Sequence, residues 1–343
     1  MEQRGEQAHE IVCRDRVAIT AVVAAYNEEA YIGRCLHGLL AQEGLSDDFE
    51  ILVIDGMSTD RTADIVRSFP EYGTRIKLFS NPRRLQVYAW NEALQQARGE
   101  YFAMILAHAE YSPDYFASCL EVMRRTGAVA VGGVQRPFGT GLLGEAIAWC
   151  MSTALGMGNA RFRYTAHEEE TDSVFSIFSR TARLRAIGGY DESLPFDEDS
   201  DLNYRLRQNG GKLIVSPHIH VRYHVRRSLK ALWKQMFCYG YWRRFTQLKH
   251  GGRVPLRVFA PAALVAALVF SVMLAATPLR LAALAVPALY CGFLLAGALG
   301  AVRRAGAGAL LVPAVLATMH VAYGTGWWKA LLSRRRRMAA APA

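Results

Sequence analysis

The sequence lacks acidic residues over its entire C-terminal part. Residues 222–343 contain 18 Lys and Arg but no Asp or Glu, and Asp201 is the last acidic residue of the chain. Residues 1–221 contain 22 Lys and Arg against 30 Asp and Glu, so the overall charge of +10 combines a negative part with a strongly positive one. This division argues against one uniform domain and predicts two parts that meet different surroundings.

Signals for export and for structural zinc are also missing. Met1–Arg16 is charged and contains no apolar stretch of the secretory kind, which predicts that the first part of the chain stays in the cytoplasm. No Cys-x-x-Cys pair occurs, so a reduced compartment without structural zinc is predicted. The six cysteines are Cys13, Cys35, Cys119, Cys150, Cys238 and Cys291.

Long apolar segments are present, and all of them lie in the basic part. They are Val258–Thr277, Leu281–Val302 and Ala307–Leu332. Each is near or above the roughly 20 residues that a helix needs to cross a bilayer, which favours membrane attachment over burial in a soluble core. Aromatic and basic residues are not arranged with these segments as in a nucleic-acid platform, so no nucleic-acid partner is expected.

Residues 222–257 join the two parts and are basic and rich in Trp and Tyr. This composition is typical of the headgroup layer and predicts interfacial helices, with a solvated surface helix as the alternative. Three full spans would place Arg334–Arg337 outside the cell, against the positive-inside tendency. Two spans, with Ala307–Leu332 lying in the interface or re-entering, would keep every basic cluster inside. We therefore predict this arrangement for the membrane-embedded residues 258–343.

The first part alternates apolar, β-branched runs with helical patterns, whereas residues 127–185 are glycine-rich and less regular. The predicted strands are Val17–Ala25, Phe49–Ile54, Ile76–Ser80 and Tyr101–Leu106. Such alternation predicts an α/β domain with a mostly parallel, Rossmann-like sheet over residues 1–221. Ligands bind at the carboxyl ends of parallel strands, so the loops at Asn27, Asp55 and His108 should meet in one cleft.

Four motifs in the expected order resemble family 2 glycosyltransferases of the GT-A fold over roughly residues 17–250. They are Val22–Glu29, Asp55–Thr62, Ala97–Glu100 and Glu198–Leu202. Each motif is weak alone, but the four together form a strong signal. Further segments are similar to the succinoglycan-biosynthesis glucosyltransferases of the ExoA type. These are Asn81–Arg84, Ala107–Tyr111, Pro113–Tyr115, Asp201–Arg205 and Gln235 with Tyr239–Gly240.

The resemblance implies an inverting hexosyltransferase of the bacterial inner membrane. Its catalytic domain would be cytoplasmic, its donor a nucleotide sugar, UDP-glucose in the ExoA group, and its acceptor linked to polyprenyl diphosphate. The pathway implied is exopolysaccharide synthesis, with other polysaccharide-assembly proteins as possible partners. At matching positions Ala25, Asn27 and Glu28 would line the nucleotide pocket, and Asp55 would hold base and ribose, although a turn-forming Asp before Gly is the plainer alternative.

Asp199 matches the family's general base, which takes the proton of the acceptor hydroxyl. The alternative is a helix N-cap before a helix starting at Ser200. Asp201 and Arg205 are assigned to the substrate site in a supporting role only, because their i,i+4 spacing also suits a simple ion pair.

The sequence departs from the family at the end of the fourth strand. The family has Asp-x-Asp or Asp-Ala-His there, facing the diphosphate and its Mg2+ or Mn2+, whereas this chain reads Leu106-Ala107-His108. His108 alone is a poor ligand for a hard cation. The alternatives are an ion held by phosphate, water and His108, a shifted pair of His108 with Glu110, or a weakened enzyme.

The junction offers a substitute for the missing charge. Its arginines could bind the diphosphate in bidentate fashion, or they could contact anionic lipid headgroups. They are Arg226, Arg227, Arg243 and Arg244. Two rival functions also stay open at this point: a polyprenyl-phosphate glycosyltransferase, which needs little help from a base, and a catalytically weakened relative that binds or scaffolds.

Overall fold

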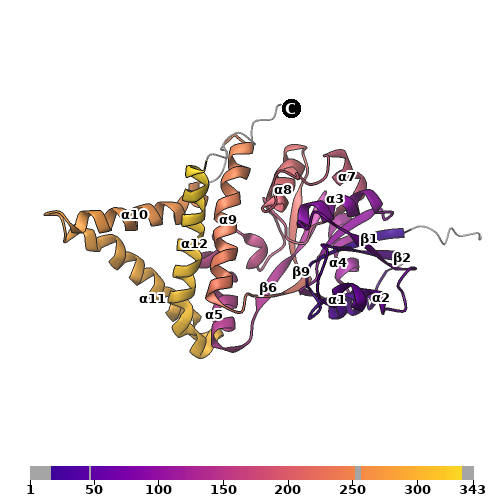
Figure 1. The fold of residues 1–343 in the computed structure, drawn as a ribbon, viewed down its shortest axis with the longest axis horizontal. Helices are drawn as coiled ribbons and strands as arrows, with labels where there is room; N and C mark the ends of the chain where they lie inside the picture. Colours follow the sequence, from indigo (N-terminus) through magenta and orange to yellow (C-terminus); the bar gives the residue numbers. More distant parts are fainter. Residues whose placement is uncertain (1–16, 46–47, 252–255, 334–343) are drawn as a thin grey trace, which may run out of the picture.

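The computed structural model of the chain describes residues 17–45, 48–251 and 256–333. The predicted positions of Met1–Arg16 and of the cluster Arg334–Arg337 lie outside the described residues. In Figure 1 an α/β domain occupies one side of the molecule, and a block of long helices occupies the other.

One sheet of nine strands organises the α/β domain. Its strands are β1 (Val17–Ala25), β2 (Asp48–Asp55), β3 (Ile76–Ser80), β4 (Tyr101–Leu106), β5 (Ala109–Tyr111), β6 (Ala130–Phe138), β7 (Glu169–Glu170), β8 (Phe178–Arg180) and β9 (Leu213–His224). They follow the order β3-β2-β1-β4-β8-β6-β9-β5, with β7 also paired to β9. The neighbours β3, β2, β1 and β4 are all parallel, and so are β6 and β9. The prediction of an α/β fold with a mostly parallel sheet is confirmed.

Helices cover both faces of the sheet. They are α1 (Ile32–Leu40), α2 (Thr62–Arg67), α3 (Gln86–Gln96), α4 (Tyr115–Thr126), α5 (Gly141–Met151), α6 (Ala154–Met157), the short 3-10 helix η1 (Arg161–Arg163), α7 (Thr181–Ala186) and α8 (Glu198–Gln208). Alternate residues of a strand face opposite sides, and β1 shows the result. Val23 packs in the cluster that contains Leu36 of α1, whereas Val22 packs with Trp90 of α3 and with α8.

The helical block begins directly after β9, which runs through the predicted boundary at residue 221. Its elements are α9 (Leu229–Lys249), η2 (Leu256–Phe259), α10 (Ala260–Ala275), η3 (Ala282–Leu284), α11 (Ala285–Ala305), η4 (Gly306–Leu311) and α12 (Val312–Leu332). Helices α9 and α12 lie side by side between the sheet and the outer hairpin (Figure 1). The junction, predicted as interfacial helices, is thus largely one 21-residue helix.

Two glycines allow α9 and α12 to pack backbone to backbone. A Cβ atom added at Gly240 would lie 1.9 Å from the carbonyl oxygen of Tyr323, and one added at Gly326 would lie 2.2 Å from that of Phe237. Small residues permit such close approach between helices. The α9–α12 contact therefore tolerates no side chain at these two positions without separation of the helices.

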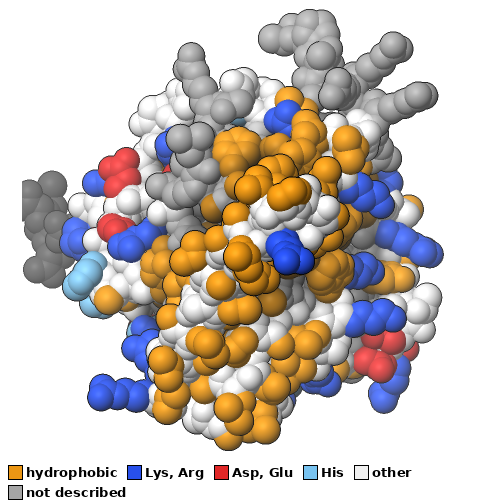
Figure 2. All heavy atoms as spheres, turned by 90° about the vertical axis from the view of Figure 1, so that its left-hand side faces the viewer, with side chains coloured by type: hydrophobic (Ala, Val, Ile, Leu, Met, Phe, Trp, Pro, Cys, Tyr) orange, Lys and Arg blue, Asp and Glu red, His pale blue; other side chains and the backbone are white. Residues whose placement is uncertain are grey.

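The helices α10 and α11 project from the rest of the molecule as an apolar hairpin (Figure 1). Large apolar side chains are exposed along both helices, and Figure 2 shows them gathered on one face, with Lys and Arg around it. In the described part of the chain, one helical run is long and apolar enough to cross a membrane, Ala282–Leu332. It contains α11 and α12 with η4 between them, whereas α10 has only 16 residues.

Candidate active site

The sheet register brings the predicted nucleotide residues to one edge. Ala25, the last residue of β1, pairs with Asp55, the last residue of β2, and Asp55 pairs with Ser80 of β3. On the other side of β1, Ala24 pairs with Leu106 at the end of β4. We call this row of strand ends the carboxyl edge.

Two loops leave the carboxyl edge and are bonded to each other. The side chain of Asn27 accepts a hydrogen bond from the backbone N–H of Thr59 at 2.8 Å, and Ser58 Oγ accepts one from the N–H of Asn27 at 2.9 Å. Farther along, Thr62 Oγ1 accepts from the N–H of Glu28 at 2.8 Å. Asn27 has φ +54, a left-handed conformation that Asn tolerates better than most residues. The sequence motifs around Asn27 and Ser58 thus form one structural unit.

Asp55 is oriented by this unit. Its carboxylate accepts hydrogen bonds from the hydroxyl of Ser58 at 2.5 Å and from the Ser58 N–H at 3.1 Å. Only 8% of Asp55 is exposed. The turn-forming role considered from the sequence is therefore real, and it fixes the carboxylate at the strand end.

His108 continues the same edge beyond β4. Its Nδ1 lies 3.0 Å from Glu28 Oε1, and its ring lies 5.7 Å from that of Tyr223 on β9. Glu110 instead bonds Arg222 at 3.0 Å and lies 3.4 Å from His224. The shifted pair of His108 with Glu110 is therefore wrong, because the chain turns after β4 and Glu110 has other partners.

These residues do not by themselves form a site for a divalent ion. Mg2+ and Mn2+ require several oxygen ligands, and Leu106 supplies none. His108 and Glu28 are bonded to each other, and among the described residues no group of three His, Cys, Asp or Glu could hold a metal.

Asp199 lies in the first turn of α8. This helix begins at Glu198 and its N-cap is Asp197, so the capping role considered for Asp199 is wrong. The carboxylate accepts a hydrogen bond from the N–H of Ser200 at 2.7 Å. Its charge also acts on two buried tyrosines.

Tyr190 and Tyr239 both lie within electrostatic range of Asp199. Burial raises the pKa of Tyr190 well above its usual value, and the carboxylates of Glu198 and Asp199 raise it further. The Tyr190 hydroxyl is 3.6 Å from Met104 Sδ, on β4 two residues before Leu106. Burial likewise raises the pKa of Tyr239 on α9 to about 12, and Asp199 adds to that effect. The start of α8 lies against α9, because Asp197 is bonded to Arg243 of that helix.

Two further acids precede Asp199, and they do not ionise like surface carboxyls. Burial raises the pKa of Asp197 to about 6, despite the Arg243 guanidinium 2.9 Å away. Burial and the charge of Asp199 raise the pKa of Glu198. Like charges this close oppose one another, so burial and mutual repulsion raise the pKa of Asp197 and of Glu198 in the same direction.

Asp201 and Arg205 face the protein interior. Asp201 is 0% exposed, and its carboxylate bonds Arg205 Nε at 2.7 Å, Lys249 Nζ at 2.5 Å and His250 Nε2 at 2.8 Å. Arg205 also donates to two backbone carbonyls, those of Ile187 and Gly189. Their positions assign both residues to the attachment of α8 to the end of α9, and their contact with substrate stays an untested prediction.

The junction arginines approach this region at two points. Arg227 Nη2 donates to the hydroxyl of Tyr31 at 2.8 Å, and the Tyr31 ring lies 6.4 Å from His108. Arg243 bonds Asp197, next to Asp199. Arg244, in contrast, lies over the ring of Trp327 on α12.

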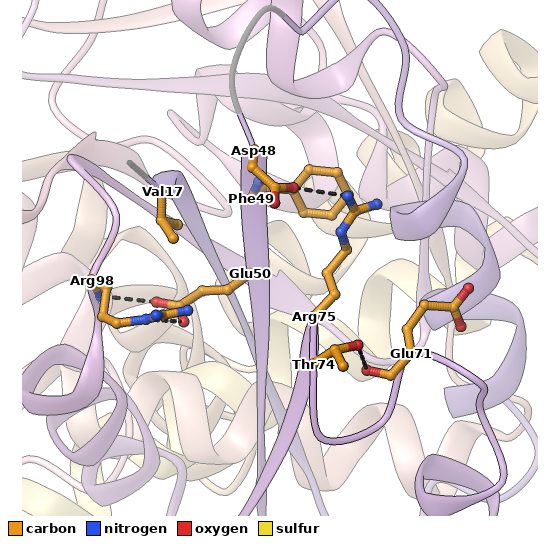
Figure 3. A pocket seen from close by; sticks show the side chains of 8 residues that line it. All are labelled: Val17, Asp48, Phe49, Glu50, Glu71, Thr74, Arg75 and Arg98. Carbon is orange, nitrogen blue, oxygen red and sulfur yellow. Dashed lines mark hydrogen bonds and ion pairs between the residues drawn. The ribbon is translucent and has the colours of Figure 1, made fainter. Parts of the chain in front are cut away.

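A hollow lies at the opposite, amino ends of the strands (Figure 3). Val17, Asp48, Phe49, Glu50, Glu71, Thr74, Arg75 and Arg98 line it. Glu50 is 1% exposed and is bonded by Arg98 and Thr20, both at 2.9 Å. Burial alone would raise the pKa of Glu50, but the hydrogen bonds from Arg98, Thr20 and Lys77 outweigh it and lower that pKa. The Ala97–Glu100 motif thus stabilises the fold at the amino ends of the strands.

Sequence reasoning missed a group of polar residues between β6, β9 and α9. Gln135, Arg163 and Gln235 are at least nine-tenths buried, and each has polar side-chain atoms without a hydrogen-bond partner in the described part of the chain. Gln235 belongs to a segment already noted in the sequence, but Gln135 and Arg163 show no spacing pattern, so only the structure reveals the group.

Comparisons with known proteins agree with this architecture. Residues 20–186 match the model of the family described as "Glycosyl transferase family 2". The chain is 32% identical over 293 residues to the succinoglycan biosynthesis protein ExoA of Rhizobium meliloti, covering 84% of this chain and 88% of that protein. It is 29% identical over 230 residues to a Methanococcus voltae enzyme named dolichyl N-acetyl-alpha-D-glucosaminyl phosphate 3-beta-D-2,3-diacetamido-2,3-dideoxy-beta-D-glucuronosyltransferase, covering 65% and 71%.

The fold is also that of a solved enzyme. The mannosyltransferase PcManGT of Pyrobaculum calidifontis, solved with GDP-Man and Mn2+, superposes with a TM-score of 0.60 at 21% identity, over 93% of this chain and 88% of that one. At this identity the likeness concerns the fold alone. Motifs, sheet order and sequence identity together show that this chain belongs to glycosyltransferase family 2 and is a glycosyltransferase.

Proposed function

We propose that this glycosyltransferase transfers a hexose, glucose from UDP-glucose in the first instance, to an acceptor linked to polyprenyl diphosphate, with inversion at the anomeric carbon. The observation that supports the proposal is the register that brings Ala25 and Asp55 to the carboxyl edge, where His108 follows β4. In this scheme the loops around Asn27 and Asp55 bind the nucleoside of the donor.

The reaction follows from these positions. Asp199 accepts the proton of the acceptor hydroxyl as its oxygen attacks the anomeric carbon. The bond from that carbon to the donor phosphate breaks, and the nucleoside diphosphate leaves with the electron pair. Arg227 and Arg243 are the cations near the edge that favour the extra negative charge of the leaving group. No step is assigned to a metal ion, because the residues present do not form a site for one.

A lipid-linked acceptor is supported by the helical block. The apolar hairpin of α10 and α11 lies on the far side of α9 and α12 from the sheet (Figure 1), so a lipid held beside it has its polar end toward the α/β domain. The names of the two relatives refer to succinoglycan biosynthesis and to a dolichyl sugar phosphate. We therefore infer a role in exopolysaccharide synthesis at the bacterial inner membrane, with residues 1–221 in the cytoplasm.

The membrane topology that we propose keeps α12 on the protein side. One face of α12 is buried against its neighbours, with Val315, Leu316, Met319 and Ala322 almost fully covered. Helices α10 and α11 expose most of their large apolar side chains, as a pair of spanning helices would. A cysteine introduced after Arg337 should resist an impermeant thiol reagent on intact cells. Labelling there would show that the chain end is outside.

The function is tested with the full chain purified in detergent. Labelled nucleotide sugars are offered with polyprenyl-diphosphate-linked acceptors, with and without a chelator. Asp199→Asn should lower transfer by about 10²- to 10⁴-fold, because that range is typical of a lost general base. The matched control is Glu121→Gln, which neutralises an exposed carboxylate on α4 and should leave transfer unchanged.

The same assay separates the rival reactions. An enzyme that uses polyprenyl phosphate itself as nucleophile needs little help from a base. Transfer to polyprenyl phosphate that survives Asp199→Asn would therefore overturn our proposal in favour of that enzyme. Donor binding without transfer to any acceptor would identify the weakened relative suggested by Leu106.

A further inference from the structure

Buried polar groups, several of which have no partner among the described residues, gather on one face of the sheet beside α9. We define the inner polar cluster as Gln135, Arg163, Tyr223, Gln235 and Tyr239. Gln135 on β6 pairs with Val221 of β9, two residues before Tyr223, so Gln135 and Tyr223 point to the same face of the sheet. The guanidinium of Arg163 on η1 lies 5.9 Å from the Tyr223 ring.

Helix α9 closes the cluster from the other side. Gln235 Nε2 donates to the hydroxyl of Tyr223 at 3.2 Å and to that of Tyr239 at 3.0 Å. The Arg163 guanidinium lowers the pKa of Tyr239, against the effects of burial and Asp199. The inner polar cluster therefore extends from α9 to the neighbourhood of His108, whose ring is 5.7 Å from that of Tyr223.

The hydrogen-bonding capacity of this cluster is largely unused. Arg163 is 5% exposed and Gln135 is 0% exposed. Within the described residues, Arg163 Nε and Nη1, both amide atoms of Gln135 and Oε1 of Gln235 have no hydrogen-bond partner. Arg161, on the same turn, shows the ordinary arrangement, because its Nε and Nη2 bond Glu169 at 2.6 and 2.8 Å.

A buried guanidinium without a hydrogen-bonded anion is costly, and natural proteins rarely keep buried polar groups unsatisfied. Functional sites are the usual exception, because a ligand supplies the missing partner. Arginine forms bidentate hydrogen bonds with phosphate. An anion with several acceptor oxygens fits the Arg163 donors and the Gln135 amide.

We propose that the inner polar cluster binds the diphosphate of the lipid-linked acceptor, with Arg163 as its principal ligand. This inference rests on the proposed function, which supplies the lipid-linked acceptor. The donor site begins at β1 and β2, whereas the cluster lies past β4, on β6, β9 and α9. Helix α9 in turn packs on α12 of the helical block. A lipid tail beside that block and an acceptor hydroxyl at Asp199 place the connecting diphosphate between them.

The test uses full-length protein in detergent, with binding measured by calorimetry and unfolding followed by heating. The probes are farnesyl diphosphate, farnesol, inorganic pyrophosphate and UDP. The wild type should bind farnesyl diphosphate and should not bind farnesol. Inorganic pyrophosphate should compete with farnesyl diphosphate for the same site. Arg163→Met should weaken farnesyl diphosphate binding at least tenfold and leave UDP binding unchanged.

The unfolding temperature distinguishes a ligand-binding role of Arg163 from a packing role. Arg163 is buried and has no hydrogen-bonded anion among the described residues, so Arg163→Met should keep or raise the unfolding temperature of the ligand-free protein. Farnesyl diphosphate should no longer raise the unfolding temperature of this variant. Arg163→Lys should retain part of the binding, and the control Arg161→Met should retain all of it. A lowered unfolding temperature of ligand-free Arg163→Met would show a structural role and overturn the inference.

Two other results would also contradict the inference. Equal weakening of UDP and farnesyl diphosphate by Arg163→Met would assign the cluster to the donor. Displacement of farnesyl diphosphate by phosphatidylglycerol micelles at similar concentration would make it a general headgroup site. Because the readout is binding, the inference stands or falls independently of whether sugar transfer is detected.

Discussion

The two edges of the central sheet use polar residues for different purposes. At the amino ends of the strands, Glu50 is almost fully buried and accepts hydrogen bonds from Arg98 and Thr20. At the carboxyl edge, Asp55 is bonded mainly by its own loop, and beyond β4 the buried Arg163 has donors without a partner among the described residues. Satisfied groups stabilise a fold, whereas incompletely satisfied groups await a ligand. The difference supports the carboxyl edge as the functional one, although a hollow lies at the amino ends of the strands (Figure 3).

The largest effect that we expect from this comparison is on stability. Glu50→Ala should lower the free energy of unfolding by about 3 kcal/mol, because it leaves buried partners of a carboxylate without an acceptor. Donor binding should not change, since the substitution is at the far end of the strands. Denaturant unfolding and UDP titration measure the two quantities. Glu71→Ala, in the same hollow, is the control and should change stability by less than about 0.5 kcal/mol. Loss of UDP binding in a folded Glu50→Ala protein would erase the distinction between the edges.

A smaller effect concerns the missing acid of the metal motif. Leu106→Asp places a carboxylate at the end of β4, near His108, and should reduce the Mn2+ concentration needed for half-maximal transfer by about tenfold, because hard cations favour carboxylate oxygens. Titration of transfer against Mn2+ measures this. Leu106→Asn introduces a side chain of the same shape as Asp but without its charge, and it serves as the control. If turnover and ion dependence are both unchanged in Leu106→Asp, the missing acid has no consequence here.

The smallest effect is a change in the pH dependence of stability. The folded-state pKa of Glu198 is raised, mainly by burial and by Asp199, so the protonated form favours folding and stability falls as the pH rises through that value. Glu198→Gln stays neutral and should lose less stability between pH 5 and pH 8 than the wild type does, by about 1 kcal/mol or less. Thermal unfolding at several pH values provides the measurement. Parallel curves for the two proteins would show that Glu198 does not titrate in this range.

Much of the α/β domain could be predicted because its buried strands have a recognisable apolar, β-branched sequence. Val17–Ala25 is apolar and β-branched, and the structure has a strand with these bounds. The predicted strand ends in turn indicated which loops should meet at the carboxyl edge. The region of residues 127–185 gave no such pattern, because β6 and β8 pair with distant strands and a glycine-rich sequence does not show those pairings.

The site was predictable where it depends on local order and not where it depends on distant segments. Asp55 is the last residue of its strand and Asn27 comes two residues after the end of another, so their positions at the carboxyl edge could be predicted from the sequence. Asp201 was grouped with the substrate residues, but the sequence could not show that Lys249 and His250 enclose it. Arg163 has neither a motif nor a periodic neighbour, and its environment is assembled from three separate segments.

The bonds of Asp201 also constrain the order in which the chain acquires its structure. The sheet and α8 are complete in the sequence by residue 224, but the Lys249 and His250 partners of Asp201 come at the end of the next helix. Helix α9 in turn packs against α12, and the two glycines of this contact, Gly240 and Gly326, are 86 residues apart in the sequence. During synthesis from the N-terminus, the Asp201 carboxylate therefore lacks its Lys249 and His250 partners until α9 has been synthesised. We expect a nascent or truncated chain that ends before residue 249 to hold α8 loosely and to be open to proteolysis there.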